Sequence, residues 1–197
     1  MKEIWESRYA ENEFVYGKEP NEFFKNFIDN TKPGKILLPA EGEGRNAVYA
    51  ALKGWDVYAF DQSVNAKNKA LKLASIHGVT IKYIVCDYSE LSYADESFDA
   101  IGIIYFHLPE NEKATAFNRI FKYLKPQGNL ILEVFDKEQI INKSGGPKDI
   151  DLLYDIHEME ILFHSFGKKT IKKEYIKLNE GKLHQGEAIV IRIEAEK

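Results

Sequence analysis

The amino-acid sequence predicts a doubly wound, Rossmann-like α/β domain. Short apolar runs of strand length alternate with segments of helical pattern, as a buried parallel sheet covered by helices on both faces requires. A glycine-rich loop follows the first of these runs and leads into a helical segment. Two alternating segments near the end predict an antiparallel hairpin, which completes a mostly parallel sheet of seven strands.

Each expected element has its own local signal. Parallel strands are expected at residues 36–39, 57–60, 81–85, 100–104 and 130–135, and the hairpin strands at 169–178 and 186–194. Helices are expected at 23–28, 47–53, 65–77, 110–124 and 150–163. Asn21 can cap the first of these helices, and the turn Lys125-Pro126-Gln127-Gly128 stops the fourth.

The composition predicts one soluble globular domain. The chain has 197 residues, of which 44% are hydrophobic and 29% charged, and this is enough to build a core of its own. It divides into an aromatic and helical segment at 1–30, an α/β core at 34–135, and a helix with antiparallel strands at 148–197. Because it shows neither a secretory signal nor a bilayer-spanning run, we expect a cytoplasmic protein without a membrane partner.

Charge and cysteine content argue against several classes of function. The formal net charge is −4, and Lys168, Lys169, Lys172 and Lys173 read as solvated charge around a strand, so nucleic acid is not an expected partner. The one cysteine, Cys86, cannot form an internal disulfide or a zinc or redox pair. His157-Glu158 begins like a zinc-protease helix, but Ile161 stands where the second histidine is needed, so no metal site is expected.

A ligand site is expected at the edge where the carboxyl ends of the parallel strands meet. That edge collects Ala40 to Gly44, Asp61, Asp87-Tyr88 and Tyr105-Phe106-His107, each after a different strand. The glycines let a ligand approach the backbone, Asp61 can accept from two ribose hydroxyls, and Asp87 can accept from an adenine amine. For both aspartates, turn or cap chemistry is the alternative.

The glycine-rich loop differs from a dinucleotide-binding loop in spacing and charge. The run Gly42-Glu43-Gly44-Arg45-Asn46-Ala47 lacks the third glycine of G-x-G-x-x-G. Glu43 would bring negative charge to the place where a pyrophosphate meets a helix N-terminus, and Glu41 adds to it. A nucleoside with cationic groups and no phosphates, such as S-adenosylmethionine, is therefore favoured, and nearby aromatic rings suit its sulfonium through cation–π contact.

Motifs across nearly the whole chain carry a family resemblance. They are Trp5-Glu6-Ser7-Arg8-Tyr9, Tyr16-Gly17-Lys18-Glu19-Pro20-Asn21, Ala40-Glu41-Gly42-Glu43-Gly44-Arg45-Asn46-Ala47, Phe98-Asp99, His107-Leu108-Pro109, Leu124-Lys125-Pro126-Gln127-Gly128, Gly145-Gly146-Pro147, Glu180-Gly181, His184 and Gly186. With these motifs the chain resembles a class I S-adenosylmethionine-dependent methyltransferase, and is similar to the tellurite-resistance and thiopurine methyltransferase group.

The resemblance implies S-adenosylmethionine as cofactor, S-adenosylhomocysteine as product, and a set of cofactor-binding residues. These are Ala40, Glu41, Gly42 and Gly44 at the methionine part, Trp5, Tyr16 and Gly17 closing over it, Asp61 and Gln62 at the ribose, Asp87 and Tyr88 at the adenine, and Tyr105 beside them. Family members most often have an acid where Leu38 stands, and Gly-Cys where Ala40-Glu41 stands. Our hypothesis is that Glu41 replaces the lost acid in holding the cofactor's amino group.

Methyl transfer to a small-molecule acceptor asks the protein mainly to position the acceptor and exclude water. A thiol or other soft nucleophile needs no base, whereas for other acceptors His107 is the expected general base. The alternative for His107 is a loop histidine bonded to backbone, and His184 is a weaker candidate base. We expect a monomer or homodimer. Two other functions stay open: a non-catalytic protein that binds the cofactor or its product, and a nicotinamide-dependent oxidoreductase.

Overall fold

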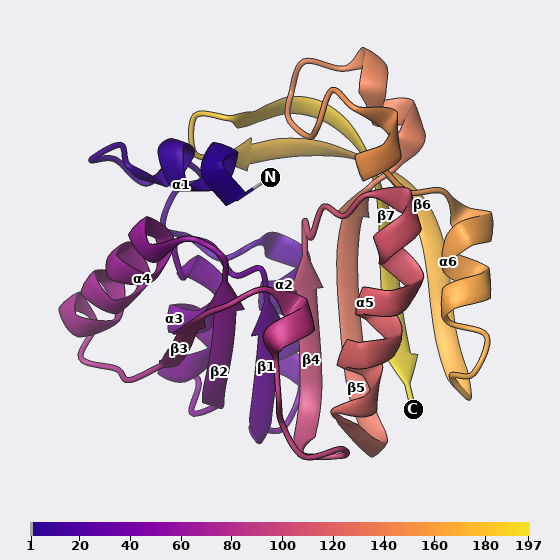
Figure 1. The fold of residues 1–197 in the computed structure, drawn as a ribbon, viewed down its shortest axis with the longest axis horizontal. Helices are drawn as coiled ribbons and strands as arrows, with labels where there is room; N and C mark the ends of the chain where they lie inside the picture. The colour runs from indigo at the N-terminus through magenta and orange to yellow at the C-terminus, as the bar shows by residue number, and fades with distance from the viewer. Residues whose placement is uncertain (1) are drawn as a thin grey trace.

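The computed structural model describes residues 2–197, which form a seven-stranded sheet of order β3-β2-β1-β4-β5-β7-β6 (Figure 1). The strands are β1 (Lys35–Pro39), β2 (Asp56–Asp61), β3 (Lys82–Val85), β4 (Phe98–Ile104), β5 (Leu124–Phe135), β6 (Lys168–Glu180) and β7 (His184–Glu196). β7 pairs antiparallel with both β5 and β6, and the remaining pairings are parallel. The fold class predicted from the sequence is confirmed.

The helices and turns connect these strands in alternation. They are α1 (Lys2–Tyr9), α2 (Glu22–Asn30), α3 (Arg45–Leu52), α4 (Val64–Ile76), η1 (Tyr88–Glu90), α5 (Glu110–Lys122), η2 (Lys137–Ile141), η3 (Ile150–Leu152) and α6 (Ile156–Leu162). The predicted cap of α2 is confirmed, because the Asn21 side chain accepts from the Phe24 amide at 3.0 Å. None of the helices within residues 2–197 has the length and apolar character needed to cross a membrane.

The helix predicted at 150–163 is wrong in its first half. Tyr154 instead lies extended beside Asp136 and forms a parallel bridge with it. Its ring is fully buried, and its hydroxyl donates to the Phe106 carbonyl at 2.7 Å. Asp155 then begins α6 by accepting from the Glu158 amide at 2.9 Å. The aromatic anchor interrupts the helix because its partners come from distant strand ends, which a local apolar period does not reveal.

The turn predicted at 125–128 lies inside β5 as a local excursion. Leu124 pairs with Phe98 and Asn129 pairs with Ala100, so residues 125–128 stand opposite Asp99 alone. Gln127 takes a φ of +64°, which explains the turn signal of this stretch. β5 therefore begins six residues earlier than the apolar run at 130–135 predicts.

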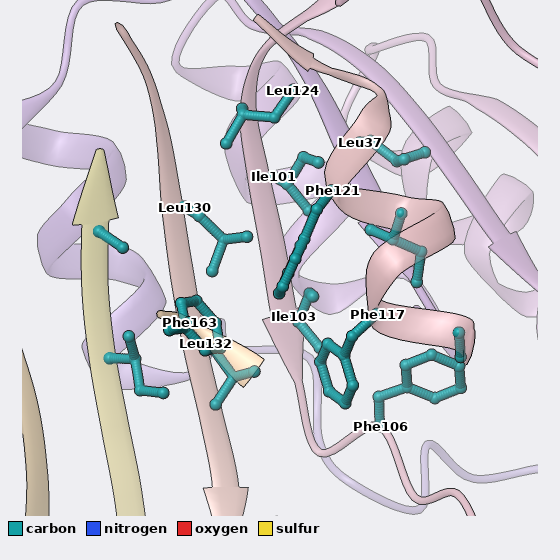
Figure 2. Close-up of a cluster of buried hydrophobic side chains, with 14 of the residues drawn as sticks. Leu37, Ile101, Ile103, Phe106, Phe117, Phe121, Leu124, Leu130, Leu132 and Phe163 are labelled. Carbon is teal, nitrogen blue, oxygen red and sulfur yellow. The ribbon is translucent and has the colours of Figure 1, made fainter. Parts of the chain in front are cut away.

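Helices cover both faces of the sheet, and each face has its own apolar core. On one face α5 and α6 pack against β4 and β5, and Figure 2 shows Phe117 and Phe121 of α5 directed at side chains of these strands. On the other face α2, α3 and α4 bury Phe24, Val48 and Leu73 against β1, β2 and β4. Burying a side chain of this size stabilises the fold by roughly 1.5–3 kcal/mol. The two cores hold the strand ends in fixed positions.

The carboxyl ends of the parallel strands open toward the upper edge in Figure 1, where α1 and the outer half of the β6–β7 hairpin cross above the sheet. The strand order reverses between β1 and β4, which is where open α/β sheets bind ligands. The chain that leads from α1 to α2 reaches this edge as well, since a Cβ on Gly17 would lie 3.2 Å from the Gly181 amide nitrogen at the hairpin tip. Segments from both ends of the chain thus enclose the edge.

Candidate active site

Two adjoining cavities lie over the carboxyl ends of β1 and β4. Trp5, Tyr9, Ala40, Tyr105 and His107 line both of them. The first cavity continues along the glycine-rich loop, where its walls are completed by Tyr16, Gly17, Glu41, Gly42, Glu43, Arg45, Asn46, Ile104 and His184. The second continues past β2 and is completed by Phe60, Asp61, Gln62, Tyr88 and Phe106. The structure therefore brings together all of the predicted site residues except Gly44 and Asp87, which are not among the lining residues described.

Gly42 brings the backbone of the glycine-rich loop against the first cavity. Its φ is +61°, and a Cβ here would lie 2.8 Å from the Tyr9 hydroxyl oxygen. From the other side, the Tyr83 hydroxyl donates to the Gly42 carbonyl at 2.7 Å. Gly44 differs, because a Cβ there would lie 2.5 Å from the Cβ of Ala70. Gly44 therefore serves the packing of α3 on α4 rather than a cavity wall.

Glu41 occupies the N-terminus of α3. Its Oε1 accepts from the Ala47 amide at 2.7 Å, which satisfies one of the donors that a helix leaves open at its start. Burial raises the pKa of Glu41 to about 8, although the Ala47 amide and the Arg45 charge act in the opposite direction. A pyrophosphate at this loop would need the same helix amides. The side chain of Glu41 thus competes directly with phosphate binding.

Leu38 points into the apolar core and away from both cavities. It is fully buried, and its Cδ2 would lie 2.9 Å from a Cβ built on Gly102 of β4. Phe24 of α2 approaches the same point. A core residue therefore stands where the family resemblance implies an acid, and Glu41 is the carboxyl group nearest to it in sequence that lines the first cavity.

Asp61 joins the end of β2 to the glycine-rich loop. Its Oδ2 accepts from the Gly42 amide at 3.1 Å, and its Oδ1 accepts from the Ser63 amide at 2.9 Å. Burial raises the pKa of this carboxyl group, and the backbone amides reduce that rise. The turn chemistry considered for Asp61 is therefore present, and the same carboxylate also lines the second cavity, where a ligand can reach it.

Asp87 caps a helix, which is the alternative role that the sequence analysis considered for it. Its side chain accepts from the Ser89 amide at 2.9 Å at the start of η1, and Glu90 returns a bond to the Asp87 amide. The Gln62 amide group donates to the other Asp87 oxygen at 3.1 Å. Gln62, which bonds to Asp87, and Tyr88, which follows it in sequence, line the second cavity in its place. Asp87 thus lies behind the cavity wall and contacts it through Gln62.

Glu43 fastens the N-terminal segment to the glycine-rich loop. Its carboxylate accepts from the Val15 amide at 2.8 Å and forms an ion pair with Lys69 at 2.7 Å. Lys69 offsets the negative charge of Glu43, so this residue repels an anionic ligand less than the sequence indicates. The case against a pyrophosphate therefore depends on Glu41 and the helix amides that it occupies.

His107 stands between two aromatic rings at the boundary of the cavities. Its imidazole stacks on Trp5 at 6.2 Å and on Phe135 at 6.0 Å between ring centroids. Burial lowers the pKa of His107 to about 3, so the ring is neutral at physiological pH. Its Nδ1 has no hydrogen-bond partner among the described residues. A base is most effective when its pKa is near the working pH, so this histidine is poorly tuned for proton removal.

Tyr105 follows β4 in a left-handed conformation, with a φ of +56°. Its ring stacks on Phe135 at 4.6 Å, and its buried hydroxyl has no hydrogen-bond partner within residues 2–197. Burial is the main cause that raises the pKa of this hydroxyl, with Glu133 next. A buried polar group of this kind costs about 1–3 kcal/mol, which a ligand at the cavity can recover by accepting from it.

A buried polar network lies behind the first cavity, and the sequence analysis did not predict it. Asn21 donates to Glu133 at 2.7 Å and to Glu180 at 3.0 Å. Arg45 pairs with Glu180 at 3.0 Å, and His184 lies 3.0 Å from the same carboxylate. Burial would raise the pKa of Glu180, but His184 and Arg45 hold it at about 2, so its charge is retained. The signal available was an acidic residue, Glu133, within an apolar strand.

Tyr9 is a further residue of the site that the sequence analysis did not include. It is buried, stacks on Trp5 at 5.8 Å, and reaches Gly42 with its hydroxyl. Tyr9 lies four positions after Trp5, which is the spacing of one helical face and was the available signal. Within residues 2–197 no group of three or more histidine, cysteine or acidic side chains is arranged to hold a metal ion.

Comparison with known proteins finds a family model that matches part of the chain. Residues 36–128 match the family model described as a methyltransferase domain. The matched residues thus run from β1 into β5, and they include the glycine-rich loop, Asp61 and His107. α1, α2 and the β6–β7 hairpin lie outside the matched residues.

Named methyltransferases resemble about half of the chain. Phosphoethanolamine N-methyltransferase 1 of Arabidopsis thaliana is 34% identical over 113 residues, which are 55% of this chain and 23% of that protein. Demethylmenaquinone methyltransferase of Renibacterium salmoninarum is 33% identical over 104 residues, 52% of this chain and 42% of that protein. The chain therefore spans less than half the length of these relatives.

A solved structure shares the fold of most of this chain. It is a phosphoethanolamine N-methyltransferase 2 of Haemonchus contortus in complex with phosphomonomethylethanolamine and S-adenosylhomocysteine. The TM-score is 0.65 at 20% identity, over 86% of this chain and 43% of that chain. At this identity the likeness establishes the fold.

Proposed function

We propose that this protein is an S-adenosylmethionine-dependent methyltransferase that acts on a small-molecule acceptor. The observation that carries the proposal is the pair of adjoining cavities at the strand-order switch point, where a glycine-rich loop, Asp61 and an aromatic cover converge. The match of residues 36–128 to a methyltransferase domain supports the same assignment. S-adenosylhomocysteine would be the product.

The cofactor would lie across both cavities. Asp61 and Gln62 would accept and donate at the ribose, Tyr88 would border the adenine, and Glu41 would face the methionine amino group through its second oxygen. Trp5, Tyr9 and Tyr16 would cover the sulfonium, because aromatic faces stabilise a cation by about 0.5–2 kcal/mol. The cofactor supplies an activated methyl carbon, and the chain's own residues hold the acceptor in line with it and keep water out.

His107 would position the acceptor rather than take its proton. Its low pKa and its stacking between Trp5 and Phe135 fit a rigid neutral wall. This favours acceptors that attack without help from a base, such as a thiolate or another soft nucleophile. For comparison, His184 carries a hydrogen bond to Glu180 and faces Tyr16 at 4.6 Å between ring centroids.

Turnover over a panel of acceptors tests this proposal and separates an enzyme from a non-catalytic binder. Formation of S-adenosylhomocysteine from S-adenosylmethionine is measured with thiols, amines and phenols at equal concentration. Transfer to at least one acceptor is expected, with thiols turning over fastest and an H107Q variant retaining most of that rate. Cofactor binding without turnover on any acceptor would favour the binding protein.

The role of Glu41 is tested by calorimetry. Removing its carboxyl group in E41A should weaken S-adenosylhomocysteine binding on the order of tenfold, since one charge-assisted contact is lost. The exposed Glu19 supplies a matched control, and E19A should bind like the wild type. If E41A also binds with wild-type affinity, Glu41 does not hold the amino group.

A further inference from the structure

A third and larger cavity, of about 570 Å³, opens beyond the first one. It shares Trp5, Tyr16, His107 and His184 with the first cavity, so the two spaces meet at these side chains. Its outer walls come from α1, from the loop at 143–149 and from the end of the β6–β7 hairpin. A molecule bound there can reach the residues that would surround the transferred methyl group.

The walls of this third cavity are positively charged on a protein whose formal net charge is −4. Arg8, Lys143 and Lys148 line it, against one acidic residue, Asp149. The Asp149 side chain is engaged as the cap of η3, where it accepts from the Asp151 amide. Both lining histidines have a pKa lowered by burial and are neutral. Two positive charges are therefore in excess around the cavity.

Arg8 stands at the inner end of the cavity. Its guanidinium lies 4.6 Å from the centroid of the Trp5 ring, and its Nη1 donates to the Tyr16 hydroxyl at 2.8 Å. These contacts hold the planar group in one orientation and leave other N–H donors for a ligand. A guanidinium held in this way suits carboxylate and phosphate oxygens. Lys143 and Lys148 add positive charge from the loop on the outer side.

The same cavity also offers apolar surface. Ile4 is 61% exposed and Leu183 is 40% exposed, although both are large hydrophobic side chains. They line the cavity together with Leu152 and Pro147. Exposed apolar side chains gathered at a concave site are typical of a ligand surface. A bound molecule would therefore need an apolar body as well as an anionic group.

We propose that the third cavity binds a methyl acceptor that is an organic anion, whose carboxylate or phosphate is held by Arg8, Lys143 and Lys148. Its apolar body lies on Ile4, Leu152 and Leu183, and its reacting atom faces His107. This inference rests on the proposed function, because it assigns the acceptor end of the same site. Inorganic anions bind more weakly because they lack the apolar contact. Neutral compounds of the same shape bind more weakly because they lack the ionic contact.

The test is calorimetric titration of the full chain, saturated with S-adenosylhomocysteine, with four probes. Benzoate and phenyl phosphate distinguish the two anionic groups, benzyl alcohol is the neutral analogue, and inorganic phosphate lacks the apolar body. At least one organic anion should bind on the order of tenfold more tightly than benzyl alcohol and inorganic phosphate. Equal affinity for benzyl alcohol and both organic anions, or for inorganic phosphate and phenyl phosphate, overturns the proposal.

Variants assign the effect to the cavity. K143Q/K148Q should lower the affinity for the preferred anion severalfold, and its affinities for benzyl alcohol and S-adenosylhomocysteine should stay unchanged. R8Q should lower the affinity for the anion further. The control K32Q/K122Q removes two exposed lysines that are not among the lining residues described, and it should bind like the wild type. Unchanged anion affinity in K143Q/K148Q and R8Q overturns the proposal. Failure of S-adenosylhomocysteine itself to bind the wild type would instead contradict the proposed function.

Discussion

At the scale of single residues, the backbone of Ala40 is strained because the residue is not a glycine. It follows β1 with a φ of +50°, a conformation that glycine adopts without a steric penalty and alanine does not. The residue lines both cavities, so the strain lies at the centre of the proposed site. Strained backbone is often retained at functional positions.

Replacing Ala40 with glycine should therefore stabilise the protein. A40G is expected to raise the free energy of unfolding by about 0.5 kcal/mol or more, as the left-handed penalty of roughly 1–2 kcal/mol exceeds the added chain entropy. Ala51 in α3 is the matched control, because A51G at a helical position should lose about 1 kcal/mol. Urea unfolding of both variants measures the difference, and a loss in A40G as large as that in A51G would show that Ala40 is unstrained.

Glu41 links the site to the pH dependence of stability. Its pKa of about 8 in the folded chain exceeds its ordinary value of 4.5, so between these values the folded state keeps a proton that the unfolded state has released. The stability contributed by this group is therefore lost as pH rises across that window. E41Q keeps an acceptor for the Ala47 amide and removes the titration.

Unfolding in urea at about pH 5 and at about pH 8 measures this effect. The wild type should lose stability between the two values, whereas E41Q should lose less and be the more stable protein at the higher pH. E19Q, at an exposed position, should follow the wild type. Parallel pH profiles for the wild type and E41Q would mean that Glu41 is ionised throughout.

At the scale of elements, the β6–β7 hairpin packs against and supports the N-terminal segment. Gly181 at its tip has a φ of +59°, and a Cβ there would collide with the Val15 carbonyl oxygen. The Lys182 amide donates to the same carbonyl at 3.1 Å. Two segments about 165 residues apart in the chain thus meet backbone to backbone beside the first cavity.

A methyl group at Gly181 should separate these segments. G181A is expected to weaken S-adenosylhomocysteine binding on the order of tenfold, because Tyr16 and Gly17 lose their support. Gly78 is the matched control: its φ is +68°, but nothing lies within 4 Å of a Cβ there. Both variants pay the left-handed penalty, so calorimetry on the two isolates the contact, and equal affinities would show that hairpin docking does not shape the site.

The elements differ in how well the sequence predicts them. The parallel strands and α2 to α5 were predictable because their apolar periods are local. η3 and the start of α6 were not, since Tyr154 is fixed by a bond to the Phe106 carbonyl, 48 residues away. Within the site, Asp61 and the glycine-rich loop were predictable from their strand ends. Asn21 bonds to Glu133 and Glu180 across 112 and 159 residues, and such pairings leave no local pattern.

At the scale of the whole molecule, the sheet supplies a rigid edge and both ends of the chain cover it. Residues 36–128, which match the family model, provide the strand ends and the glycine-rich loop, whereas α1 and the hairpin close the space above them (Figure 1). The three cavities meet at Trp5 and His107, which line all of them. The nucleoside of the cofactor, the methionine part of the cofactor and an acceptor would each occupy one of these adjoining cavities.

The central claim is that these cavities hold S-adenosylmethionine rather than a dinucleotide. Titration calorimetry of the full chain with S-adenosylhomocysteine, and separately with NADH, tests it most directly. We expect S-adenosylhomocysteine to bind one to one with a dissociation constant on the order of micromolar, and NADH to give no binding heat. Binding of NADH without binding of S-adenosylhomocysteine would contradict the account.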